Sequence, residues 1–311
     1  MTRVCFLLML LSVFFLFTVP EDSSAGPQRT PYSGEVNLAA PDQITLKGNI
    51  RREEISTPLG TVDLRWPRTA EVYFGRTPVK AMADAARTVS QAIRTSAFPS
   101  EIQRLNTNWN VVFMDEKLPQ TQIPAHLINN CHPGWMTPPA NIYIVAQRVA
   151  GGCGQQPRNK SSVADSDLAS VLVHEMGHAV EFHLLQGMFA QDRMRAEGFA
   201  SWFQVYAANY SSVIDRGAQR RDMFSRAKYS IRQNPSGFSS GASLFAGDSL
   251  DYARASMYFF AVVDRRGLGG LMEVYQAIAK DKLTFFAAVQ KEIGWNSEQL
   301  EKEVQRIAQK Y

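Results

Sequence analysis

The chain has 311 residues, of which 45% are hydrophobic and 20% are charged, with a formal net charge of +4. This composition can supply one sizeable folded core, and the absence of internal repeats and low-complexity tracts in the sequence argues against a repeat protein or a disordered chain. The basic pairs Arg51-Arg52 and Arg220-Arg221 are short and flanked by acidic residues, so the sequence does not indicate a nucleic-acid-binding protein.

Residues 1–25 have the features of a secretory signal peptide. Arg3 precedes an apolar run over residues 4–19, and small residues at 23–25 suit cleavage by a signal peptidase. The apolar run is shorter than the roughly 20 residues that span a bilayer, which favours a cleaved signal over an uncleaved anchor, the alternative. No later stretch of the sequence is suited to span a membrane. We therefore expect an exported protein, either periplasmic or secreted.

Signal cleavage would remove Cys5 and leave Cys131 and Cys153. Two remaining cysteines in an exported protein most simply form one disulfide. A Cys/His zinc site that uses His132 is the alternative, but it lacks paired ligands.

The segment 26–68 is rich in Pro, Ser, Thr and charge, with short β-like pieces at 43–46 and 60–64. It is expected to be a loosely ordered lead-in or a β-hairpin that packs on the main domain, residues 69–311.

The first part of the main domain has signals for both strands and helices. Val72–Phe74 is predicted as a strand, and 78–97 as a helix with Thr77 as its N-cap. Residues 108–114 are predicted as another strand because of their β-branched and aromatic content. The proline-rich stretch 119–139 is predicted as a loop.

The motif His174-Glu175-Met176-Gly177-His178 lies in an apolar run that contains nothing to break a helix. Residues i and i+4 share one helix face, so the imidazoles of His174 and His178 can reach one metal ion. Glu175 lies about 100° round the helix, beside the metal, where a general base for a metal-bound water is needed.

A catalytic zinc site needs a third protein ligand and an open position. Leu184 occupies the position six residues after His178, where another zinc peptidase pattern has a histidine, and His183 is rotated away from this face. Glu197 suits the role better, because 18 intervening residues allow the first helix to end near Gln186-Gly187 and a second helix to begin.

The pattern H-E-x-x-H, 18 residues, then E-G-F-A resembles that of the gluzincin zinc peptidases, in the peptidase MA-like and aminopeptidase branch. This resemblance covers residues 140–267. It implies one zinc ion per chain on His174, His178 and Glu197, with Glu175 as general base. It also suggests that the strand 141–146 is the edge that pairs with substrate, although an ordinary core strand fits the residues as well.

Peptide hydrolysis also requires a hydrogen-bond donor for the oxyanion. No histidine follows His183, so a tyrosine is the expected donor. The predicted helix that contains residues 250–260 and extends to Gly267 resembles the helix after the metal site in this branch. In that helix the first tyrosine points to the zinc-bound oxygen. The resemblance therefore implies Tyr252 as the donor, with Tyr206 and Tyr258 as weaker candidates.

Together these features predict an α+β, zincin-like metallopeptidase domain, with a small mixed sheet followed by a mainly helical C-terminal half that carries the zinc site. The G-x-M-E-N string, whose Glu binds a substrate amino group in the aminopeptidases, does not occur before His174. We therefore expect an endopeptidase acting on peptides or proteins. An inactive zinc-binding exported protein, and a surface interaction protein in which the motif is accidental, are the alternatives.

Overall fold

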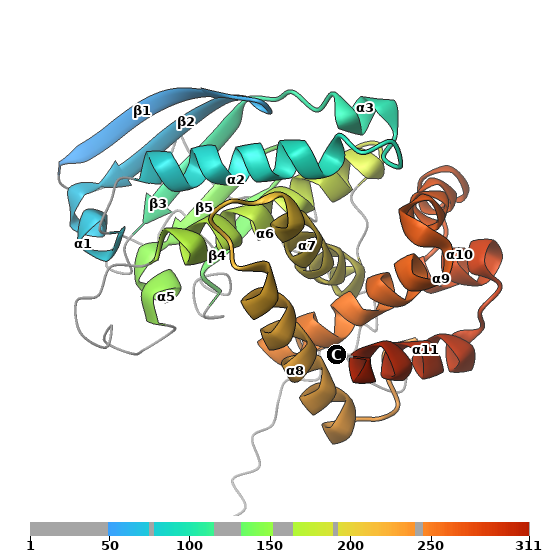
Figure 1. Ribbon diagram of the computed structural model, residues 1–311. Coiled ribbons are helices and arrows are strands. Elements are labelled where there is room, and N and C mark those ends of the chain that lie inside the picture. The colour runs from blue at the N-terminus through green and yellow to red at the C-terminus, as the bar shows by residue number, and fades with distance from the viewer. Residues whose placement is uncertain are drawn as a thin grey trace, which may run out of the picture.

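The computed structural model describes residues 49–74, 78–114, 132–151, 164–188, 192–239 and 245–310. These residues form a five-stranded mixed sheet followed by a mainly helical half, which confirms the predicted arrangement (Figure 1). None of the helices in these ranges is both long and apolar enough to cross a membrane. The predicted signal peptide and both cysteines of the predicted disulfide lie outside the described residues.

The sheet has the strand order β1-β2-β3-β5-β4. Strands β1 (Ile50–Thr57) and β2 (Gly60–Pro67) form an antiparallel hairpin. Strand β3 (Trp109–Met114) runs parallel to both β2 and β5 (Asn141–Val145). The short strand β4 (Gly134–Thr137) is antiparallel to β5 and lies at the edge of the sheet.

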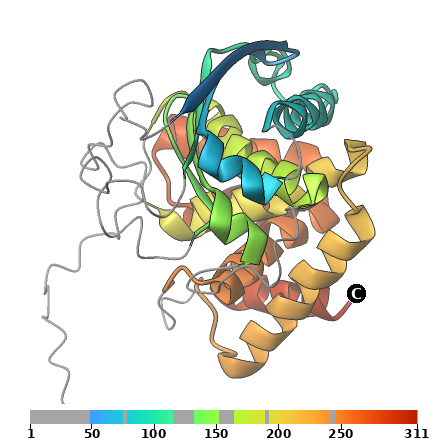
Figure 2. The same ribbon diagram turned by 90° about the vertical axis from the view of Figure 1, so that its left-hand side faces the viewer.

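The helices stack in consecutive layers beside the sheet. Helix α2 packs on α6, α6 on α7, and α7 on α9, while α8, α10 and α11 surround α9 (Figures 1 and 2). The helical elements are η2 (Arg68–Ala70), α1 (Glu71–Phe74), α2 (Pro78–Ile93), α3 (Ser100–Gln103), α5 (Ala146–Gly151), α6 (Asp165–Leu184), α7 (Arg193–Ala207), η4 (Ala208–Tyr210), α8 (Arg216–Gln233), α9 (Ser249–Asp281), α10 (Phe285–Ile293) and α11 (Ser297–Gln309).

Two local predictions are wrong. The segment predicted as a strand at Val72–Phe74 is helical, because three residues cannot distinguish the strand period from the helix period and Glu71 begins a helical turn after Pro67 ends β2. The predicted loop 119–139 contains β4. Its prolines flank the strand instead of interrupting it, and proline is tolerated beside a short edge strand.

A buried network ties α6, α7 and α9 together. The carboxylate Oε1 of Glu181 accepts hydrogen bonds from Arg195 Nε at 2.8 Å and from Tyr275 Oη at 2.7 Å. All three side chains are at most 3% exposed. Since Glu181 lies three residues after His178 and Arg195 two residues before Glu197, this network fixes the relative position of the two helices at the predicted metal site.

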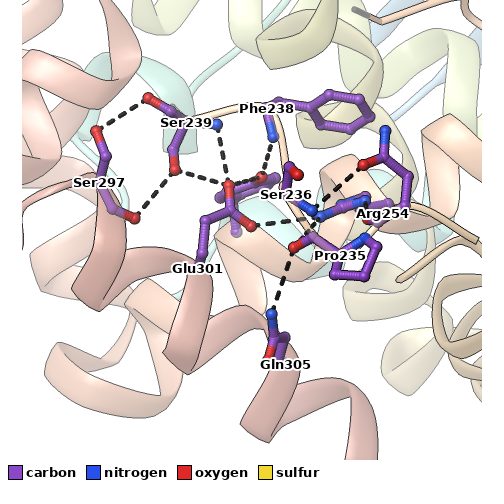
Figure 3. Close-up of polar contacts among 10 residues, drawn as sticks. Pro235, Ser236, Phe238, Ser239, Arg254, Ser297, Glu301 and Gln305 are labelled. Carbon is purple, nitrogen blue, oxygen red and sulfur yellow. Dashed lines mark hydrogen bonds and ion pairs between the residues drawn. The ribbon is translucent and has the colours of Figure 1, made fainter. Parts of the chain in front are cut away.

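A second network joins α9 and α11 to the loop that follows α8 (Figure 3). Glu301 accepts hydrogen bonds from Tyr258 Oη and from the backbone N–H of Ser239, the latter at 3.0 Å, and it pairs with Arg254 at 3.5 Å. Gly237 has a φ of +76° and passes so close to the Glu301 carboxylate that a Cβ atom would overlap it. The loop that follows α8 is therefore held against both α9 and α11.

We expect Arg195→Met to lower the free energy of unfolding by about 3–5 kcal/mol, because it leaves the buried Glu181 carboxylate without its charge partner. Adding Glu181→Gln should recover part of this loss. The two single variants and the double variant can be compared by urea unfolding. A double variant whose loss equals the sum of the single losses would show that the two side chains are not coupled.

Candidate metal centre and active site

Three side chains from two helices converge on one point. His174 and His178 are one turn apart on α6, and the Nε2 atom of each lies 3.4 Å from Oε2 of Glu197 on α7. Their ligand atoms all lie within 4.8 Å of one another, and within the described ranges this is the only cluster of His, Cys, Asp or Glu that has this arrangement. Two imidazole nitrogens and one carboxylate oxygen form a donor set that suits zinc and leaves a fourth position open.

The pKa shifts of His174 and Glu197 favour the protonation states that bind a cation. Burial, against the opposing effect of Glu197, lowers the pKa of His174, which favours the neutral imidazole that binds metals. Burial alone would raise the pKa of Glu197, but the charge of His178 and hydrogen bonds from both imidazoles outweigh it and lower that pKa well below its usual value. The carboxylate is therefore ionised at neutral pH.

The orientation of His174 is supported from α7. The imidazole hydrogen-bonds to the side chain of Gln204, an interaction that raises the pKa of His174. Gln204 in turn donates to the hydroxyl of Ser170 at 2.6 Å, and Gln219 donates to the same hydroxyl. This chain of hydrogen bonds restricts the ring to one orientation, as the outer partners of metal-binding histidines commonly do.

Glu175 is buried next to the triad, with 3% of its surface exposed. Burial first, and then the charge of Glu197, raise the pKa of Glu175 well above its ordinary value. Its Oε2 atom has no hydrogen-bond partner among the described residues. Strand β4 passes close by, because a Cβ atom at Gly134 would lie 2.9 Å from Oε1 of Glu175. A carboxyl group with an unsatisfied buried oxygen is suited to receive a proton.

Tyr252, in the first turn of α9, lies beside the triad. Its ring stacks on that of His174 with centroids 6.2 Å apart and on that of Phe245 at 5.9 Å. Its hydroxyl lies 3.4 Å from His132 Nε2 and 3.5 Å from Arg193 Nη2. Burial, followed by the charge of Glu197, raises the pKa of Tyr252 well above its ordinary value, so the hydroxyl keeps its proton at neutral pH.

The two weaker tyrosine candidates lie elsewhere. The hydroxyl of Tyr258 hydrogen-bonds to Glu301, and that of Tyr206 donates to the carbonyl oxygen of Ala92 at 3.3 Å.

The sequence analysis missed several residues around the site. Arg193 and Gln204 could have been found, because they lie one turn before and two turns after Glu197 on the same helix, but the sequence gives no signal that brings His132 or Phe245 to the same place.

The expectation that the strand 141–146 is the open edge beside the site is wrong. Strand β5 lies between β3 and β4, so its backbone groups are already paired on both sides. The carbonyl oxygen of Pro133 accepts from the N–H of Val145 at 2.8 Å. In an antiparallel pair the bonding direction alternates, so Trp135 and Thr137 face β5, whereas the N–H and C=O groups of Gly134 and Met136 point outward.

We expect Glu175→Gln to stabilise the metal-free protein more at pH 7.5 than at pH 4.5, because the amide stays neutral in the folded and unfolded states whereas burial disfavours ionisation of the carboxyl in the folded state. Below the ordinary pKa of 4.5, Glu175 is protonated in both the folded and the unfolded state, so it causes no difference. As the pH rises above that value, ionisation favours the unfolded state of the unmodified protein. Thermal unfolding in the presence of a chelator, between pH 4.5 and 8, measures this, and a difference that did not change with pH would contradict it.

Comparisons with known proteins give only weak likenesses. No family model matches the sequence, and no curated protein matches it. Among solved structures, the chain is similar to a two-domain M1 zinc metallopeptidase crystallised as a mutant with L-arginine bound, with 12% identity, a TM-score of 0.42, and coverage of 84% of this chain and 51% of the other. It is also similar to the M1 zinc metallopeptidase from Deinococcus radiodurans, with 12% identity, a TM-score of 0.44, and coverage of 84% and 52%. The chain thus spans about half the length of each, and function has to be inferred from the side chains themselves.

Proposed function

We propose that this protein is a zinc-dependent peptidase that hydrolyses peptide bonds, with one zinc ion per chain held by His174, His178 and Glu197. The observation that carries the proposal is the convergence of these three ligand atoms within 4.8 Å, with Glu175 and Tyr252 beside them. When bound, the ion would supply Lewis-acid polarisation of a peptide carbonyl and lower the pKa of a water molecule. The chemistry of the donor set and the unsatisfied buried oxygen of Glu175 both fit such a site.

Glu175 and Tyr252 have complementary roles in this proposal. Glu175 takes a proton from the attacking water and passes it to the nitrogen of the leaving amine. Its buried Oε2 atom has no hydrogen-bond partner among the described residues, so it can accept the proton and hold it between the two transfers. Tyr252, which stays protonated at neutral pH, donates a hydrogen bond to the carbonyl oxygen as negative charge develops on it.

We propose that the substrate backbone pairs with the outer edge of β4. The outward N–H and C=O groups of Gly134 and Met136 offer hydrogen bonds to an extended peptide without reading its sequence. Gly134 lies against Glu175, so a peptide bound there would pass the proposed base. This location replaces β5, the strand that the family resemblance suggested.

Several finer points rest on the sequence. Strand β4 carries no acidic side chain that could bind a substrate amino group, which favours an endopeptidase over an aminopeptidase. We propose that the protein is exported, because residues 1–25 have the features of a secretory signal peptide.

A zinc-binding protein without activity is the second candidate function. The position of Tyr252 beside His174 favours catalysis over this candidate.

We expect about one zinc ion per purified chain, and its loss in His178→Ala. Glu175→Gln should keep the zinc but lower peptide hydrolysis by about 10²–10⁴-fold, the range for losing a general acid–base group. Elemental analysis and product formation from a denatured protein substrate measure the two quantities. Full zinc content without hydrolysis by the unmodified protein would favour the inactive zinc-binding protein, and no zinc after metal-replete expression would exclude both.

Gly134→Ala tests the close approach of β4 to the base. The added Cβ would lie 2.8 Å from Ile144 Cδ1 and 2.9 Å from Glu175 Oε1, so either the strand or the carboxylate must move. A misplacement of about 1 Å can cost as much as 10²-fold in rate, so we expect kcat to fall by about 10–100-fold with zinc retained. Gly269→Ala is the matched control, because a Cβ there meets no atom within 4 Å. Equal activity of the two variants would argue against the predicted role of β4.

A further inference from the structure

Arg193 lies beside the hydroxyl of Tyr252, and the proposed mechanism of hydrolysis assigns this arginine no role. Arg193 Nη2 lies 3.5 Å from this hydroxyl. The guanidinium is held in place, because its Cζ atom lies 5.8 Å from the centre of the Phe245 ring and the backbone at Gly247 packs directly against it. Arg193 is half-buried at the start of α7, one turn before Glu197.

A second basic side chain, that of His132, lies beside this hydroxyl. His132 Nε2 lies 3.4 Å from it, and the backbone carbonyl of His132 accepts a hydrogen bond from Arg148 Nη1 at 3.2 Å. Arg148 therefore holds the backbone of His132, while His132 and Arg193 both lie beside the Tyr252 hydroxyl.

We propose that Arg193, with His132 beside it, forms a subsite for a carboxylate group of the substrate. The inference rests on the proposed peptidase function and narrows its substrate class to peptides that carry a carboxylate close to the scissile bond. If Tyr252 contacts the scissile carbonyl oxygen, a group bound by Arg193 lies within about three residues of it, because two hydrogen bonds and the 3.5 Å between the side chains separate them and an extended residue spans about 3.3–3.6 Å. Guanidinium groups bind carboxylates through two parallel hydrogen bonds, which makes this the ligand that the side chain suits best.

The carboxylate can come from two sources. It can be the C-terminal carboxylate of a short peptide that is cut near its end, or the side chain of Asp or Glu next to the scissile bond. A different role for Arg193, in which it only holds Tyr252 in place, predicts an equal loss of hydrolysis for every peptide when the arginine is replaced.

The test uses four N-acetylated hexapeptide libraries of matched composition. The first pair ends in a free carboxylate or in an amide, and the second pair is amide-terminated with Glu or Gln fixed at the third position. Initial rates at low concentration, measured by mass spectrometry of the products, give relative kcat/KM values for the unmodified protein, Arg193→Met and Arg193→Lys. Methionine keeps an apolar stem against Phe245 without the charge, whereas lysine keeps the charge without the planar fork.

We expect the unmodified protein to prefer the carboxylate library of at least one pair by about 10–100-fold, the range for a charge-assisted hydrogen-bonded pair. Arg193→Met should bring this ratio close to one, and Arg193→Lys should fall between. Preference in the first pair only assigns the C-terminal carboxylate, and preference in the second pair only assigns the acidic side chain. The subsite is overturned if neither pair shows a preference, if the preference survives in Arg193→Met, or if Arg193→Met lowers all four rates equally.

A binding measurement separates this inference from the proposed hydrolysis. Immobilised, zinc-loaded Glu175→Gln protein, with and without Arg193→Met, is exposed to the same libraries, and the retained peptides are quantified. Arg193-dependent retention of carboxylate peptides supports the subsite even where the unmodified protein hydrolyses nothing, a result that would remove only the catalytic proposal. Equal retention of carboxylate and amide peptides, or retention of none, overturns the subsite.

Discussion

The close packing of α6 against α7 is the constraint on which the candidate site depends. A Cβ atom at Gly177, between the two proposed histidine ligands, would lie 3.3 Å from the backbone of Ala200 and 3.2 Å from the ring of Phe203. Even alanine would require these neighbours to shift by a few tenths of an ångström, and a larger side chain would push the two helices apart. One turn further along, the buried pair of Glu181 and Arg195 joins the same two helices. Separating α6 from α7 would cost much of this packing, so the two helices stay in contact. Glu197 on α7 can therefore reach the imidazoles of α6.

This packing also gives two neighbouring carboxyl groups different properties. Glu197 faces two imidazoles, which lower its pKa, whereas Glu175 is buried without such partners and feels the negative charge of Glu197, so its pKa is raised. Pairs of acids whose environments shift their pKa values in opposite directions are typical of sites that divide ligand and proton-transfer roles. In this protein both environments follow from the position of each residue on its helix.

The sequence predicts the parts of the site whose geometry is local. The spacing of His174 and His178 is set by the helix period, and the 18 residues before Glu197 limit where a second helix can return. The strand at 108–114 was predicted from its β-branched and aromatic content, whereas the small mixed sheet followed by a helical half was expected from the resemblance to the gluzincins. Strand β4 was not, because four residues among prolines carry too little pattern and its place is fixed by pairing with β5. His132 and Phe245 were missed for a related reason, since only tertiary packing brings their loops to Tyr252.

The C-terminal half supports the site at two separate points through a single bent helix. Gly267, with φ of 68° and ψ of −176°, interrupts α9 and divides it into two segments. The first segment carries Tyr252 to the triad, and two residues later Arg254 pairs with Glu301 of α11. The second segment carries Tyr275 to Glu181 beneath the zinc-binding helix. A straight helix would set the two tyrosines about 34 Å apart along its axis at 1.5 Å per residue, whereas their partners His174 and Glu181 are only seven residues apart on α6. The kink at Gly267 therefore allows α9 both to supply the proposed oxyanion donor and to stabilise the helix pair that holds the proposed metal ligands.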